Sequence, residues 1–370
     1  MFEHHTYDLD DVLIDPYSNG VIGVTYEDVY TQHIWFDEEL TQWQTSLDAT
    51  FPDRVARITS WSRDRRRMLV SVEGASQAPM IYLFDAEGRR LSLLGSMYGS
   101  LGGETLPERT HIEYEARDGT TIPAYMTLPQ GEGPFPTVIL PHGGPAQREL
   151  GGFDYLAHFL ATRGYAVLQP NFRGSSGYGW EWQSDGFGEW GNGIMQHDVT
   201  DGLHAMIRAG HTDPERACIV GWSYGGYSAL AGATFTPDQY RCAAAIAPAT
   251  DLPSMMTYVR QRFGRSHWSF AYWSELMNGD ADLNSNAQLR AVSPAQNAER
   301  IQIPVLLIHG DEDSVVPIAQ SERMERALRR AGTPVRFLEL EGGDHSLADF
   351  EMRVTMLAEL EAFLATHIGE

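Results

Sequence analysis

Short apolar runs separated by helix-length segments recur from about residue 106 to the end of the chain. The apolar runs lie at residues 137–140, 165–169, 217–220, 243–247, 305–308 and 335–340. Helical patterns follow at residues 155–162, 194–209, 319–331 and 347–365. Nearly continuous apolar strands that alternate with helices are typical of a parallel sheet with helices on both faces. The pattern therefore predicts an α/β domain over residues 106–370.

The first 105 residues follow a different pattern. Short β-type runs at residues 21–26, 55–60, 68–72, 80–84 and 90–94 are separated by polar turns. A helical pattern lies at residues 36–47, and the turn at 85–88 joins the last two runs as a hairpin. This is typical of antiparallel sheet, and it contains no catalytic motif. We therefore expect a small antiparallel β-domain over residues 1–105.

Composition narrows the classes of partner. The formal net charge is −23, and all 27 basic residues are arginine. An acidic surface of this size argues against nucleic acid or an anionic membrane as partner. The absence of lysine excludes Schiff-base and Ser–Lys mechanisms. Metal-ligand spacing and a phosphate-binding glycine loop are also missing from the sequence, so we expect no metal and no cofactor.

Location is predicted from the termini and the cysteines. The first residues lack the pattern of a signal peptide, and no apolar run approaches the ~20 residues of a membrane span. Cys218 and Cys242, the two cysteines, both lie in apolar strand-like runs. We expect buried, reduced thiols and a soluble cytoplasmic protein.

The candidate nucleophile lies in the segment Gly-Trp-Ser-Tyr-Gly at residues 221–225. An apolar run precedes it and a helical pattern follows, which is the strand–turn–helix setting of a nucleophile elbow. Ser223 must occupy a tight, strained turn to project its hydroxyl above the sheet. Gly221 and Gly225 fit this turn because a side chain at either position would collide with the neighbouring strand or helix. We therefore predict Ser223 as a serine nucleophile of an α/β-hydrolase fold.

The base and the acid should follow the nucleophile in the order acid, then base. His345 lies in a glycine-rich loop directly after the last apolar run, where it can reach the sheet edge beside Ser223. His367 closes the last helix and is a poorer candidate. The acid stays open at this point, because Asp311, Asp313 and Asp251 all follow strands that end at the same edge.

Several motifs together resemble those of the prolyl oligopeptidase family, and its acylaminoacyl-peptidase and dipeptidyl-peptidase-like members above all. They lie at residues 142–145 (His-Gly-Gly-Pro), 171–179, 221–227, 309–316 and 344–345. The resemblance covers roughly residues 106–368. It implies that the acid is the third residue after the Gly of the His-Gly pair, which is Asp313.

The resemblance also implies the remaining parts of a site. The oxyanion hole would be formed by the backbone N–H groups of Gly144 and Tyr224. His142 stands where other members carry a Tyr hydroxyl, and we expect it to shape its loop. Side chains after the fourth and fifth parallel strands should line an apolar, adaptable substrate pocket, which gives Tyr224, Leu252, Met255, Met256, Val315 and Val316.

The N-terminal region departs from the family. Family peptidases carry a β-propeller before the hydrolase domain, and a propeller needs at least four blades of roughly 40–50 residues. The 105 residues here would make two blades at most. Either the chain is the tail of a longer peptidase, or the short β-domain serves as a lid or an oligomerisation surface. Because unprotected sheet edges attract partners, we expect a homo-oligomer assembled through residues 1–105.

These expectations give three hypotheses for function. The first is a serine hydrolase that uses Ser223, Asp313 and His345 on short or N-acylated peptides through an acyl-enzyme. The second keeps the same triad but acts on small carboxylic esters. The third is a non-catalytic binding module on a hydrolase scaffold, which the intact triad disfavours.

Overall fold

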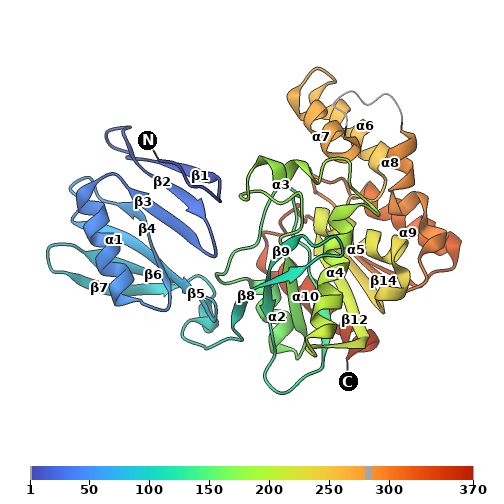
Figure 1. Ribbon diagram of the computed structural model, residues 1–370, viewed down its shortest axis with the longest axis horizontal. Coiled ribbons are helices and arrows are strands. Elements are labelled where there is room, and N and C mark those ends of the chain that lie inside the picture. The colour runs from blue at the N-terminus through green and yellow to red at the C-terminus, as the bar shows by residue number, and fades with distance from the viewer. Residues whose placement is uncertain (1, 280–285, 370) are drawn as a thin grey trace.

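The computed structural model describes residues 2–279 and 286–369, and its N-terminal region is an antiparallel β-domain (Figure 1). Strands β1 to β3 form one sheet and strands β4 to β7 form a second. The strands are β1 (Leu9–Ile14), β2 (Val21–Glu27), β3 (Thr31–Trp35), β4 (Val55–Trp61), β5 (Arg67–Gly74), β6 (Gln77–Asp85) and β7 (Arg90–Ser96). The predicted runs are confirmed as strands, whereas β1 and β3 were not predicted.

Helix α1 (Glu38–Thr50) packs against these strands and completes their core. Asp37 caps the helix by accepting a hydrogen bond from the N–H of Leu40, at 3.1 Å. Leu40 and Leu47, two helical turns apart, are fully buried with the alternate residues of β5. The helix spacing and the strand alternation therefore meet in one small hydrophobic core.

Among the described residues, the second region contains one eight-stranded sheet of order β15-β14-β13-β12-β10-β11-β9-β8. Strands β10 to β15 pair in parallel, while β8 and β9 form an antiparallel hairpin at one end. The strands are β8 (Arg109–Glu115), β9 (Thr121–Thr127), β10 (Phe135–Ile139), β11 (Ala166–Pro170), β12 (Thr212–Trp222), β13 (Cys242–Ile246), β14 (Val305–Gly310) and β15 (Val335–Leu340).

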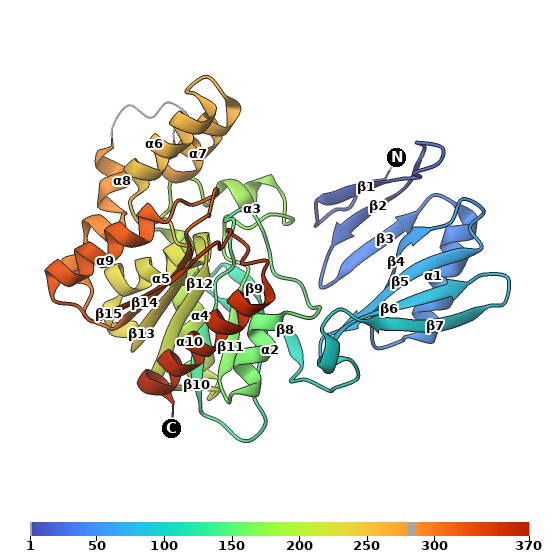
Figure 2. The same ribbon diagram turned by 180° about the vertical axis from the view of Figure 1, so that it is seen from behind.

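Helices cover both faces of this sheet (Figures 1 and 2). On one face, α2 (Tyr155–Thr162) and α10 (Phe350–Ile368) bury their apolar sides in a single hydrophobic cluster. On the other, α4 (Ile194–Arg208), α5 (Tyr224–Phe235) and α9 (Ala319–Ala331) contribute to a second cluster. Further helices complete the domain, at α3 (Trp180–Ser184), α6 (Leu252–Phe263), α7 (Trp268–Asn278) and α8 (Ala287–Ala291). The predicted α/β architecture is confirmed.

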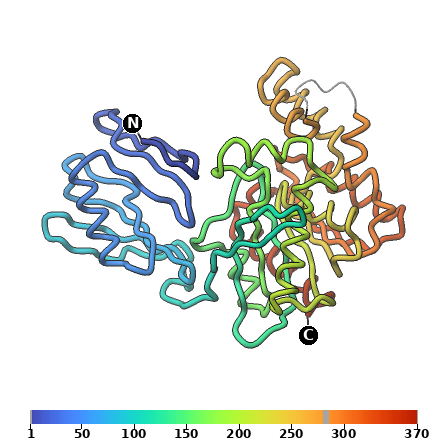
Figure 3. The backbone as a smooth tube through the Cα atoms, viewed as in Figure 1, coloured from blue at the N-terminus to red at the C-terminus, as the bar shows by residue number. Residues whose placement is uncertain are grey.

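The two regions lie side by side (Figure 3), and the loop after β10 contacts the N-terminal sheet. Arg148 donates hydrogen bonds to the backbone oxygens of Glu27 and Asp28, both at 2.8 Å. The N–H of Gly151 donates to the oxygen of Val29 at 2.6 Å. The turn between β2 and β3 is therefore held against a loop of the α/β region.

The prediction of two reduced thiols is wrong. Cys218 on β12 and Cys242 on β13 form a disulfide. The two residues are direct partners in the parallel register of these strands, so their side chains point to the same face of the sheet. No helix in the described part of the chain is long and apolar enough to cross a membrane.

Candidate active site

Ser223 occupies the sharp turn between β12 and α5. Its backbone angles are φ 59° and ψ −117°, a region that non-glycine residues rarely adopt. A Cβ on Gly221 would lie 2.2 Å from the carbonyl carbon of Gly225, and one on Gly225 would lie 2.1 Å from the oxygen of Pro141. Glycine at both positions is what allows the strand, the turn and the helix to approach this closely.

This crowding predicts that Gly225→Ala destabilises the protein. The new methyl group would meet backbone atoms that cannot rotate away, so we expect the free energy of unfolding to fall by about 1–3 kcal/mol or more. Gly95→Ala is the matched control, because a Cβ there meets nothing within 4 Å. Denaturant unfolding of both variants would measure the difference. Equal stabilities would contradict the packing described for the turn.

Asp313 and His345 lie in direct contact on the loops after β14 and β15. The Nδ1 atom of His345 is 2.6 Å from Oδ2 of Asp313. The other carboxylate oxygen, Oδ1, accepts hydrogen bonds from the N–H groups of Val315 and Val316, at 2.8 and 2.9 Å. Burial alone would raise the pKa of Asp313, but hydrogen bonds from His309 and His345 hold it well below its ordinary value. Asp313 is therefore an ionised, fixed acceptor.

The other candidate acids have different partners. Oδ1 of Asp311 accepts a hydrogen bond from the N–H of Gly342 at 2.6 Å, and the residue is exposed. Asp251 caps helix α6 through the N–H of Ser254 and accepts a hydrogen bond from Gln296. Of the three candidate acids, Asp313 is the one whose carboxylate contacts His345 among the hydrogen bonds of the described residues.

The loops that carry Asp313 and His345 are joined through their backbones. A Cβ on Gly310 would lie 2.2 Å from the oxygen of Gly343, and the N–H of Glu312 donates to that same oxygen at 3.0 Å. The indole Nε1–H of Trp222 donates to the backbone oxygen of His345 at 2.9 Å. The end of the nucleophile strand is therefore tied to the loop of the candidate base.

Gly144 and Tyr224 line the same cavity as Ser223. Tyr224 is the first residue of α5, and the first N–H groups of a helix have no partner within it. Gly144 has φ 114°, and a Cβ there would lie 2.8 Å from the nitrogen of Ala146. The left-handed backbone at Gly144 therefore requires glycine.

His142 contacts both its own loop and the loop after β11, and it is not among the described residues that line the cavity. Its Nδ1–H donates to the oxygen of Gly143 at 2.7 Å, and its Nε2 lies 2.8 Å from Oγ of Ser175. The ring stacks on Phe172 at 4.3 Å between centroids. Burial lowers the pKa of His142 to about 4, so the ring is neutral near pH 7. These contacts support its predicted role in shaping the loop.

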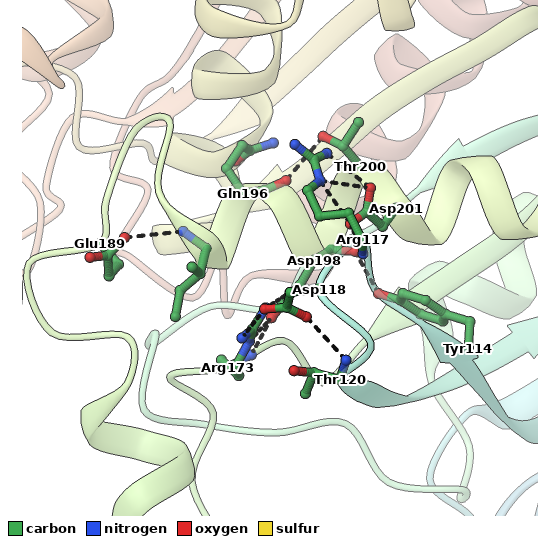
Figure 4. Close-up of polar contacts among 11 residues, drawn as sticks. Tyr114, Arg117, Asp118, Thr120, Arg173, Glu189, Gln196, Asp198, Thr200 and Asp201 are labelled. Carbon is green, nitrogen blue, oxygen red and sulfur yellow. Dashed lines mark hydrogen bonds and ion pairs between the residues drawn. The ribbon is translucent and has the colours of Figure 1, made fainter.

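The loop after β11 contacts His142 through Phe172 and Ser175, and the buried side chain of Arg173 anchors this loop. Arg173 donates to both carboxylate oxygens of Asp198 on α4, at 2.7 and 3.0 Å, and to Asp118 at 2.6 Å. Figure 4 draws these residues. Ser175 follows two residues later and contacts His142. The ion pairs thus fix the loop after β11, on which the loop of Gly144 rests.

A cavity of about 660 Å³ opens beside Ser223 and His345. Three of the predicted pocket residues, Met255, Val315 and Val316, line it together with Tyr224. Leu252 and Met256 do not; both are buried in the hydrophobic core, so their assignment to the pocket is corrected. Leu252 lies at the buried start of α6, and Met256 lies beside the pocket-facing stripe of that helix.

Several lining residues were not predicted. The stripe on α6 continues through Tyr258, Val259 and Arg262, which share a helix face with Met255. Trp190 supplies an aromatic wall. Helical spacing from Met255 would have found the first three, whereas Trp190 comes from a loop whose course the sequence pattern does not predict.

Residues 152–370 match the sequence profile of the prolyl oligopeptidase family. The chain is 30% identical to dipeptidyl aminopeptidase BIII of Pseudoxanthomonas mexicana, over 98% of this chain and 53% of that protein. It is 25% identical to the human (Homo sapiens) acylamino-acid-releasing enzyme, over 90% of this chain and 43% of that protein.

Among solved structures, a Mycobacterium tuberculosis puromycin-hydrolyzing peptidase is similar, with a TM-score of 0.71 and 26% identity. The match covers 82% of this chain and 46% of that one. The chain thus spans about half the length of the relatives it matches.

Proposed function

Because this chain belongs to the prolyl oligopeptidase family, we propose that it is a serine hydrolase with Ser223 as nucleophile, His345 as general base and Asp313 as acid. The observation that carries the proposal is the 2.6 Å contact between His345 and Asp313 at a cavity that both Ser223 and His345 line. The same three groups in other folds perform acyl transfer, so their roles follow from geometry and chemistry.

The reaction then has two halves. His345 Nε2 takes the proton of Ser223 Oγ as the hydroxyl attacks the acyl carbonyl, and Asp313 stabilises the imidazolium through Nδ1–H. The N–H groups of Gly144 and Tyr224 donate to the oxyanion, which is worth a few kcal/mol of transition-state stabilisation for such donors. His345 gives its proton to the leaving group, and water releases the acyl group by the reverse sequence.

We propose short or N-acylated peptides as substrates. The similar proteins are named a dipeptidyl aminopeptidase and an acylamino-acid-releasing enzyme, which favours peptides. The cavity walls are apolar and aromatic, with Met255, Val316, Trp190 and Trp273 among them. Such walls suit an apolar acyl or aminoacyl group.

A carboxylesterase with the same triad is the second candidate. In the described part of the chain, every residue that lines the cavity comes from the range 143–346, so the N-terminal β-domain contributes nothing to its walls. An entrance not narrowed by that domain would admit esters of varied size.

A substrate panel tests these proposals. We expect turnover of acyl-aminoacyl or dipeptidyl anilides to exceed that of short-chain p-nitrophenyl esters in kcat/KM. Turnover of the esters without any turnover of the anilides would reject the proposal that the protein is a peptidase. A fluorophosphonate probe should label Ser223, and failure to label it, together with no turnover, would leave only the binding-module hypothesis.

We also propose a homo-oligomer formed through the β-domain. Strands β1 and β7 end their sheets, and both carry exposed apolar side chains, which are Leu9, Val12, Ile14, Leu93 and Leu94. Exposed apolar edge strands favour pairing with another chain. Light scattering is expected to give at least twice the monomer mass of 41.3 kDa. A monodisperse monomer would contradict the proposal.

A further inference from the structure

A second histidine, His309, contacts the carboxylate of Asp313 from the protein interior. It is the penultimate residue of β14 and is completely buried. Its Nε2 atom lies 3.2 Å from Oδ2 of Asp313 and 2.9 Å from the backbone oxygen of Val316. Its Nδ1 atom lies 2.7 Å from Oγ of Ser321 on α9. Oδ2 of Asp313 therefore faces two imidazole rings, His309 and His345.

The partners of His309 fix where its proton lies. The backbone oxygen of Val316 can only accept a hydrogen bond, and an ionised carboxylate can only accept as well. Nε2 must therefore carry a hydrogen, which it directs between Val316 and Asp313. In the neutral ring, Nδ1 is then an acceptor and receives the hydroxyl proton of Ser321, a buried residue of α9.

We propose that His309 is a positioning residue that holds Oδ2 of Asp313 where it can accept the Nδ1–H of His345. This inference rests on the proposed triad. The backbone N–H groups of Val315 and Val316 hold Oδ1, while His309 holds Oδ2, so each carboxylate oxygen has a fixed donor besides the triad base. The terminal torsion of an aspartate is broad, and without these donors the carboxylate could turn away from His345.

His309 acts on catalysis through Asp313 alone. It is not among the residues that line the cavity, and its side chain is fully buried under the loop of Asp313. Its loss should therefore change kcat and leave KM unchanged. A histidine needed only for folding would change stability, and its effect would not depend on the acid.

Two substitutions separate these roles. His309→Gln keeps an amide N–H near the position of Nε2, whereas His309→Leu keeps the bulk and removes the donor. With a p-nitrophenyl ester as substrate, we expect His309→Leu to lower kcat about 10- to 100-fold with KM unchanged, a size common for a partner that orients a reacting group. His309→Gln should recover most of this loss.

A double-mutant cycle with Asp313→Asn supplies the decisive measurement. If His309 acts through Asp313, replacing it in the Asp313→Asn background should have little further effect on the rate of fluorophosphonate labelling of Ser223. Additive losses, or equal kcat for the Gln and Leu variants, would overturn the proposal. Wild-type protein without labelling or turnover would instead reject the proposed function itself.

Ser321→Ala keeps the proposal testable if His309→Leu does not fold. This change removes the hydroxyl that contacts Nδ1 and helps to hold the His309 ring, at a position away from the cavity. We expect a several-fold fall in kcat with KM and melting temperature nearly unchanged. An unchanged kcat would count against the positioning role proposed for the His309 ring.

Discussion

Replacing Ser223 with alanine is expected to lower kcat by about four to six orders of magnitude while the fold stays intact. The hydroxyl is the atom that forms the acyl-enzyme, and no neighbouring group can take its place on the same turn. Alanine carries the same Cβ, so the left-handed backbone at φ 59° becomes no more strained. Steady-state kinetics on the best panel substrate, together with fluorophosphonate labelling, would measure the loss.

Ser228→Ala is the matched control for this change. Ser228 lies on α5, the helix that follows the turn of Ser223; it is buried and donates a hydrogen bond to Oε1 of Gln196 at 2.8 Å. Its loss should cost about 1 kcal/mol of stability and leave kcat within a few-fold of wild type. If Ser223→Ala turns over substrate at the wild-type rate, the nucleophile has been assigned wrongly.

Asp313→Asn is expected to be nearly as severe, with kcat lower by about four orders of magnitude. Asp313 receives four hydrogen-bond donors, two backbone N–H groups on Oδ1 and two imidazoles on Oδ2. An asparagine must present an NH2 group to one of these pairs. If that NH2 group faces His345, Nδ1 must accept its hydrogen bond, and the hydrogen of the neutral ring then lies on Nε2. An Nε2 atom that already carries a hydrogen cannot take the proton of Ser223.

Asp311→Asn tests whether the neighbouring carboxylate matters. Its Oδ1 accepts only the N–H of Gly342 among the hydrogen bonds of the described residues, and an asparagine oxygen can accept the same bond. We expect kcat within about threefold of wild type, because a neutral acceptor keeps this loop contact. Both variants should be compared for kcat and for melting temperature. A severe Asp311→Asn with a mild Asp313→Asn would reverse the assignment of the acid.

The sequence predicted the parts of the site whose position follows from chain order. Ser223 and His345 could be chosen because a strand–turn–helix motif and a loop after the last parallel strand place them at one sheet edge. Asp313 needed the family resemblance, because Asp311 lies two residues away in the same loop. What separates the two carboxylates is the set of donors around each one, and those donors are arranged by the three-dimensional course of the loop.

Other features depended on contacts that periodicity does not encode. Strand β1 has mostly exposed residues, so it lacks the alternation that identifies a strand. The Cys218–Cys242 bond depends on the register of β12 and β13, and a shift of one residue would direct the thiols to opposite faces. His309 was visible as part of a motif, but its contact with Asp313 requires knowing how the chain turns after β14.

The position of β15 at the end of its sheet has a consequence for how activity is lost. His345 follows this strand, which among the described residues pairs only with β14. Edge elements open by local unfolding at a lower free energy than the whole domain. Fraying of β15 would withdraw His345 while β12 still holds Ser223 in its turn. On mild denaturation, activity should therefore be lost before secondary structure is lost. Protein returned to native conditions before global unfolding should regain its activity quickly.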